Sequence, residues 1–166
     1  LARSRRLAIF LKKIGYQVSF VLDHQNEFLN NYLKEFQVYS VYSFTESYLN
    51  QEDDANRTIR LFSKKEVKAI VIDDYRFFEV WESVMRNFGY KIVVLDDQDK
   101  NKHICDLLVD STWQGTKTLQ RYKNKIEKDC MRLLGPKYLL IDNPLESNPN
   151  FEYSASYDNK SFSILL

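Results

Sequence analysis

The sequence has few of the residues that mark a disulfide-bonded or metal-bound domain. Only two of its 166 residues are cysteine, Cys105 and Cys130. Two cysteines are too few for a disulfide scaffold in a domain of this size, and they lack the CxxC spacing of zinc ribbons. We therefore expect reduced thiols and no metal site.

Long apolar runs and blocks of like charge are also missing. The most apolar stretches, AIVID and KIVVLD, reach an aspartate after a few residues, far short of the roughly 20 apolar residues that a bilayer requires. The 24 basic and 23 acidic residues nearly balance, which argues against nucleic acid or a membrane as a partner. No export signal marks the start of the sequence, so we expect a cytoplasmic protein.

Glycine and proline are scarce, with four and three residues. The sequence contains no glycine-rich loop that would cradle a phosphate, which excludes P-loop and dinucleotide-binding motifs within it. What is abundant is apolar surface, because 44% of the residues are hydrophobic. That content is sufficient for one compact core.

Apolar runs alternate with amphipathic segments along the chain. The runs are apolar nearly throughout, which is typical of strands buried on both faces of a sheet. Apolar residues recur at helical spacing between them, and glycines at 15 and 89 end two of these segments. This alternation predicts an α/β domain with a doubly wound parallel sheet. We expect strands at 16–23, 37–44, 68–73, 91–96 and 105–110, and helices at 2–15, 26–36, 53–66 and 77–89.

The two ends of the sequence differ from a complete domain of this type. A helix without a preceding strand opens it, whereas the first strand of such folds normally lies in the centre of the sheet. SFSILL at the other end has the pattern of a strand with nothing after it. We therefore expect three parts of a longer protein, namely a lobe at 1–141 that lacks its first strand, a linker at 142–160 and the beginning of a second lobe at 161–166.

Acidic residues follow three of the predicted strands. They are Asp23, the pair Asp73 and Asp74, and the pair Asp96 and Asp97. The carboxyl ends of parallel strands share one edge of the sheet, where such folds bind ligands. Aspartate is also a preferred helix cap, so each could serve the turn alone. A converging cluster could hold Mg²⁺ or the hydroxyl groups of a sugar, and spacing does not choose between these alternatives.

Other polar residues are ambiguous on the sequence alone. Tyr75 directly follows an acidic pair, and its phenol could bind substrate or simply lie at the surface. The residues next to His24 and Cys130 in the sequence do not complete a catalytic or metal-binding motif, so both are interpreted as structural. The basic segment 116–134 is interpreted as a helix that turns five apolar residues inward: Leu119, Tyr122, Ile126, Met131 and Leu134.

Four motifs, in this order and spacing, resemble one family. The family comprises the nucleotide-sugar hydrolases of nonulosonic acid biosynthesis, typified by the UDP-2,4-diacetamido-2,4,6-trideoxy-altropyranose hydrolase of the pseudaminic acid pathway. The resemblance implies a Rossmann-like N-terminal lobe of a GT-B fold, and it spans most of the chain. The motifs are LARSRRLAIFLKKIGYQVSFV, VIDDYRF, KIVVLDD with HICDLLVD, and LLGPKYLLI.

The resemblance implies a reaction and a set of site residues. The reaction is release of UDP from a UDP-linked sugar by attack of water at the anomeric carbon, without a cofactor. Its base would be a histidine immediately before Leu1, and the missing C-terminal lobe would bind the nucleotide. By the same resemblance, Tyr75 and Asp74 are catalytic, and the substrate-binding residues are Arg3, Asp97, His103 and Tyr138. Asp142 and the following NPLE depart from the arginine that the family usually carries there, which puts the contacts of that loop in doubt.

Two other functions remain open. A GT-B glycosyltransferase would share the two lobes but pass the sugar to an acceptor other than water. A receiver-like or other non-catalytic binding domain would use the acidic edge of the sheet to bind Mg²⁺.

Overall fold

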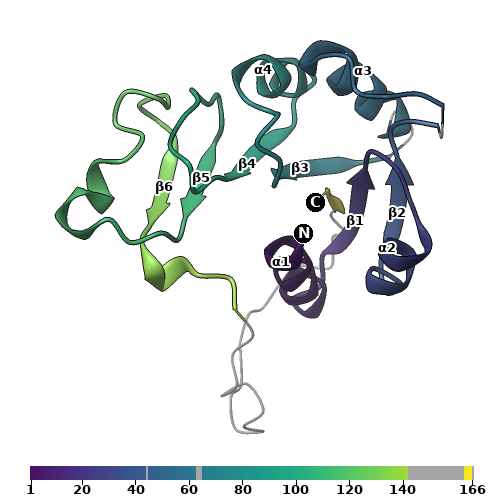
Figure 1. Ribbon diagram of the computed structural model, residues 1–166, viewed down its shortest axis with the longest axis horizontal. Coiled ribbons are helices and arrows are strands. Elements are labelled where there is room, and N and C mark those ends of the chain that lie inside the picture. Colours follow the sequence, from purple (N-terminus) through teal and green to yellow (C-terminus); the bar gives the residue numbers. More distant parts are fainter. Residues whose placement is uncertain (44, 63–64, 142–162, 166) are drawn as a thin grey trace, which may run out of the picture.

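The computed structural model describes residues 1–43, 45–62, 65–141 and 163–165, and within them it forms one parallel sheet of seven strands (Figure 1). Every pair of neighbouring strands is parallel. The order across the sheet is β2-β1-β7-β3-β4-β5-β6. The doubly wound α/β fold expected from the alternating pattern is thereby confirmed. The strands are β1 (Gln17–Leu22), β2 (Gln37–Ser40), β3 (Val67–Ile72), β4 (Lys91–Leu95), β5 (Leu107–Asp110), β6 (Met131–Leu134) and β7 (Ser163–Leu165).

Helices cover both faces of the sheet (Figure 1). On one face lie α1 (Ala2–Lys13) and α2 (Glu27–Tyr32), and on the other lie α3 (Gln51–Phe62) and α4 (Glu79–Asn87). Successive residues of a strand point to opposite faces, so each strand contributes to two cores. In β3, Val71 packs in the core that contains Ala8 of α1, whereas Ile70 and Ile72 pack in the core that contains Met85 of α4.

Local chemistry explains where several helices begin and end. The side chain of Asn26 accepts a hydrogen bond of 2.8 Å from the amide of Leu29 and so caps the first turn of α2. Gly15 and Gly89 follow α1 and α4 with φ of 96° and 89°. A side chain is strained in this left-handed region, which accounts for glycine at both positions.

The segment 116–134 differs from the predicted helix. It forms a 3₁₀ helix, η1 (Gly115–Gln120), followed by turns and then by β6. Tyr122 adopts φ of 60°, which breaks any helix there. Leu119 and Met131 are 74% and 62% exposed instead of turning inward. The prediction was wrong because apolar spacing does not reveal the pairing of β6 with β5, which supplies the backbone hydrogen bonds that a helix would otherwise make.

Residues 163–165 occupy the middle of the sheet. The sequence assigns 161–166 to the beginning of a second lobe, but β7 pairs with β1 on one side and with β3 on the other. It takes the central position that the expected missing first strand would occupy. The expected linker at 142–160 lies outside the described residues. No helix among the described residues is long and apolar enough to span a bilayer.

Candidate functional site

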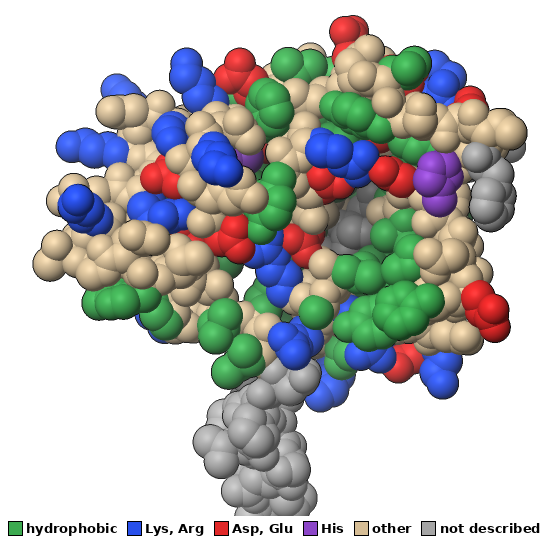
Figure 2. Space-filling view, in the orientation of Figure 1, with side chains coloured by type: hydrophobic (Ala, Val, Ile, Leu, Met, Phe, Trp, Pro, Cys, Tyr) green, Lys and Arg blue, Asp and Glu red, His purple; other side chains and the backbone are tan. Residues whose placement is uncertain are grey.

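A pocket of about 430 Å³ lies at the carboxyl ends of β1 and β3. The last described positions of β7 pair with Ser19 and Ile70, whereas β1 and β3 continue to Leu22 and Ile72. The strand ends therefore form the apolar walls of a cavity in the middle of the sheet edge. The order in which the chain adds strands to the sheet reverses direction between β1 and β3. Open α/β sheets bind ligands at such a switch point. Figure 2 shows acidic and basic side chains around a hollow on this face.

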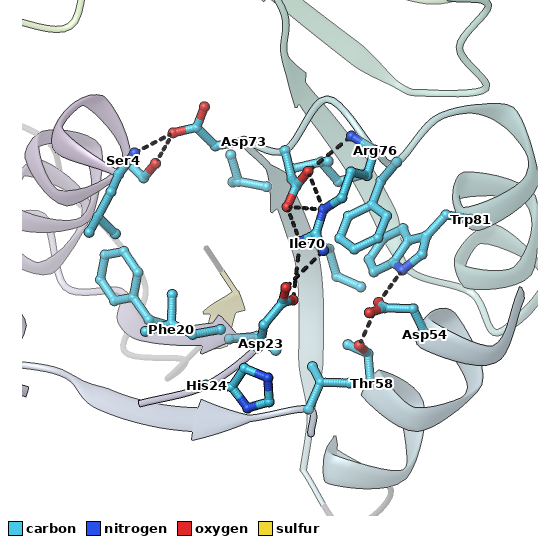
Figure 3. Close-up of a pocket in the computed structure, with 18 of the residues that line it drawn as sticks. Ser4, Phe20, Asp23, His24, Asp54, Thr58, Ile70, Asp73, Arg76 and Trp81 are labelled. Carbon is cyan, nitrogen blue, oxygen red and sulfur yellow. Dashed lines mark hydrogen bonds and ion pairs between the residues drawn. The ribbon is translucent and has the colours of Figure 1, made fainter. Parts of the chain in front are cut away.

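Arg76 joins two of the predicted acidic positions across the pocket (Figure 3). Its Nη1 lies 2.8 Å from Oδ2 of Asp23, and its Nε lies 3.0 Å from Oδ1 of Asp74. The two carboxylates raise the pKa of Arg76, with Asp74 contributing most. All three side chains are about one third exposed, at 38%, 36% and 34%. The group can therefore offer both N–H donors and carboxylate acceptors to a ligand.

A second ionic group lies beside the first and contains three of the predicted residues. Nε of Arg3 lies 2.7 Å from Oδ1 of Asp73, and its Nη1 lies 3.2 Å from Oδ2 of Asp97. The hydroxyl of Tyr75 donates to Oδ1 of Asp97 at 2.7 Å. Burial, followed by this hydrogen bond, raises the pKa of Tyr75. Ser4 donates to Asp73, and both line the pocket. Adjacent residues of one loop, Asp73 and Asp74, thus connect the two ionic groups.

A buried carboxylate forms part of the pocket wall opposite Ser4 (Figure 3). Asp54 of α3 is 1% exposed and accepts hydrogen bonds from the Tyr42 hydroxyl at 2.7 Å and from Nε1 of Trp81 at 2.8 Å. Burial raises its pKa. The sequence analysis missed Asp54 because an acid in the first turn of a helix has an ordinary explanation. It also missed His24, which lines the pocket although no local pattern distinguishes it.

None of the four predicted substrate-binding residues lines this pocket, and His103 and Tyr138 also lie outside both ionic groups. His103 is 4% exposed, with its Nδ1 2.6 Å from Glu82 and its Nε2 3.6 Å from Asp96. Burial disfavours the charged ring, but the two carboxylates outweigh it and raise the pKa of His103 to about 9. Tyr138, in the 3₁₀ helix η2 (Pro136–Tyr138), lines a separate, largely apolar groove beside α1. Of the predicted site residues, the structure thus places Asp74 on the pocket and brings Tyr75, Arg3 and Asp97 together beside it. Asp74, Tyr75 and His103 also line a small separate recess, whereas Tyr138 lies in the groove beside α1.

The described residues contain no group of three or more histidine, cysteine, aspartate or glutamate side chains placed to hold a metal ion. In each ionic group one guanidinium pairs with two carboxylates, Arg76 with Asp23 and Asp74 at the pocket and Arg3 with Asp73 and Asp97 beside it, so each set of three side chains keeps a net negative charge. Such groups can bind hydroxyl or amide groups of a ligand, because guanidinium donates and carboxylate accepts hydrogen bonds. Compared with known proteins, the chain matches no family model and no curated protein.

Proposed function

We propose that this chain is the sugar-binding part of an enzyme that releases UDP from a UDP-linked diacetamido-trideoxy sugar by water attack at the anomeric carbon. The observation that carries the proposal is the pocket between β1 and β3, where the Asp23–Arg76–Asp74 group borders an apolar cavity. Its volume of about 430 Å³ lies in the range of small-molecule sites.

The pocket presents the two kinds of surface that a deoxy sugar requires. Carboxylate oxygens of Asp23 and Asp74 would accept from hydroxyl and amide groups, and Arg76 would donate to carbonyl and ring oxygens. Phe20, Ile70 and other apolar residues line the cavity floor and would contact methyl groups and the C–H faces of the ring. This combination favours a sugar over a purely ionic ligand.

The two ionic groups supply distinct roles in the proposed reaction. Asp74 lines the pocket and would hold the sugar, and Tyr75, the next residue of the same loop, would reach the substrate from beside the pocket with its hydroxyl oriented by Asp97. Arg3 links Asp73 to Asp97 and so fixes the position of that rim. The resemblance places the base histidine directly before Leu1, and Leu1 lines this pocket. A histidine next to Leu1 would be the general base that deprotonates the attacking water in the proposed reaction.

The test measures release of free UDP and free sugar by the protein produced from the complete reading frame that encodes this chain. We expect Arg76→Ala to lower kcat/KM about 100-fold, because it removes two charge-assisted contacts that organise Asp23 and Asp74. Arg86→Ala is the matched control, since Arg86 also pairs with an exposed carboxylate, Glu127, but lies outside the pocket. Absence of UDP release, or equal effects of the two variants, would contradict the proposal.

A further inference from the structure

The two cysteines of the chain lie next to each other although 25 positions separate them in the sequence. Their sulfur atoms are 3.4 Å apart. Cys105 lies two residues before β5, and Cys130 lies directly before β6. Both side chains belong to the core on the α3 and α4 face of the sheet, at 1% and 8% exposure. The folded chain therefore juxtaposes two thiols that the sequence analysis expected to remain reduced.

We propose that Cys105 and Cys130 are a redox modification site, at which exchange with a low-molecular-weight disulfide forms a reversible cross-link between the beginnings of β5 and β6. This inference is independent of the proposed sugar hydrolysis.

The backbone around the two residues holds the sulfur atoms close together. Leu107 of β5 pairs with Met131 of β6, and the amide of Met131 donates to the carbonyl of Asp106 at 2.9 Å. A disulfide requires a sulfur separation of about 2.0 Å, so closure from 3.4 Å requires only a small side-chain adjustment. The strand pairing can remain intact while the bond forms.

The two thiols differ in exposure and in pKa, and this difference determines which of them reacts first with the small disulfide. Cys130 is the more exposed, and its thiolate is stabilised by the hydrogen bond with Cys105, which lowers the pKa of Cys130. The same hydrogen bond and burial raise the pKa of Cys105. The attacking thiolate in such exchange is the more accessible and more readily ionised one, here Cys130.

The proposed chemistry has two exchange steps. The Cys130 thiolate attacks one sulfur of the small disulfide, breaks its S–S bond and expels one small thiolate. The Cys105 thiolate then attacks Sγ of Cys130 in this mixed disulfide and expels the second small thiolate. The protein loses two S–H bonds and gains one S–S bond. The small disulfide is reduced to two thiols, which take up the two protons.

The experiment uses the folded 166-residue chain in buffers with graded ratios of oxidised to reduced glutathione. After acid quenching and alkylation, mass spectrometry of a tryptic digest reports whether the peptide 103–117 is joined to the peptide 129–132. We expect this linked pair in the monomer, reversal by excess reduced glutathione, and a rise in Tm of roughly 5 °C because the bond constrains the unfolded chain.

Single variants separate the cross-link from other oxidation. Cys105→Ser should stop at the mixed disulfide on Cys130 without the rise in Tm, whereas Cys130→Ser should react more slowly because Cys105, at 1% exposure, is the more deeply buried of the two thiols. Two results on the wild-type chain would overturn the proposal. One is that both thiols of the folded chain are fully alkylated at a glutathione ratio that cross-links the same thiols in the urea-unfolded chain. The other is accumulation of only a mixed or intermolecular disulfide.

Discussion

Two clusters, each with one basic side chain between two carboxylates, lie at the same edge of the sheet and differ in what they can do. In the pocket cluster, Arg76 bridges Asp23 and Asp74, and all three side chains are about one third exposed, at 38%, 36% and 34%. In the buried cluster, His103 lies between Glu82 and Asp96, and no side chain exceeds 7% exposure. Both clusters place a basic group between two carboxylates, but only the exposed one can contact a ligand, whereas the buried one can only stabilise the fold.

The two clusters differ in exposure because the strand ends beside them are covered to different extents. Tyr122, in the loop between β5 and β6, donates its hydroxyl to Asp96 at 3.0 Å and lies 3.2 Å from Asp110. This ring is 1% exposed and covers the end of β4. The ends of β1 and β3 instead border the pocket. Removing a partner from the covered cluster should consequently cost far more stability than removing one from the pocket cluster.

The largest effect on stability is expected for Glu82→Gln. Glu82 is fully buried, and its carboxylate contacts Nδ1 of His103 at 2.6 Å and the amide of Ile104 at 2.5 Å. The substitution keeps the shape of the side chain but leaves the buried imidazolium with one carboxylate fewer. We expect the free energy of unfolding to fall by about 3 kcal/mol, measured by urea denaturation.

Glu79→Gln is the matched control for this variant. Glu79 begins the same helix, α4, but its side chain is exposed. We expect a change within about 0.5 kcal/mol. Similar losses for the two variants would show that the buried cluster contributes no more than a surface charge does.

A pH-dependent effect of comparable size should come from His103. Its pKa is about 9 in the folded chain and 6.5 without partners. The imidazolium therefore stabilises the folded state fully below pH 6.5, and this contribution is lost as the pH rises through 9. We expect the free energy of unfolding to decline by a few kcal/mol across this range, at about 1.4 kcal/mol for each unit of pKa difference.

The measurement follows the imidazole protons of His103 by NMR alongside urea denaturation at each pH. His103→Gln should remove most of the decline between neutral and alkaline pH. A His103 ring that titrates near neutrality would contradict the assigned cluster.

The sequence predicted the regular part of this architecture well because that part depends on local patterns. Apolar runs such as 68–73 and glycines after α1 and α4 indicate buried strands and helix ends without knowledge of distant residues. The rule that parallel strands share a carboxyl edge was sufficient to bring Asp74 and Asp97 to one region. The sequence did not predict which distant strands pair. The insertion of β7 between β1 and β3, and the pairing of β6 with β5, depend on residues far apart in the chain.

The site was predicted less completely for a related reason. A sequence shows that His103 and Asp96 follow a strand, but it does not show that Tyr122 covers them. It also does not show that Asp54 of α3 reaches the pocket wall, since this depends on the packing of Trp81 of α4 against it. Residue type was informative at this edge, whereas burial required the tertiary structure.

The smallest effect on stability should come from Tyr75→Phe. This variant separates an effect on substrate binding from an effect on folding. The lost hydroxyl donates to Asp97 at 2.7 Å, but the ring is 46% exposed and Arg3 still holds Asp97 at 3.2 Å. We expect a loss below about 1 kcal/mol in urea denaturation. In the proposed enzyme, KM for the nucleotide sugar should nevertheless rise several-fold, whereas Tyr138→Phe, in the separate groove beside α1, should leave it unchanged. A loss of stability as large as that of Glu82→Gln, or an unchanged KM, would place Tyr75 with the structural residues instead of at the rim of a binding site.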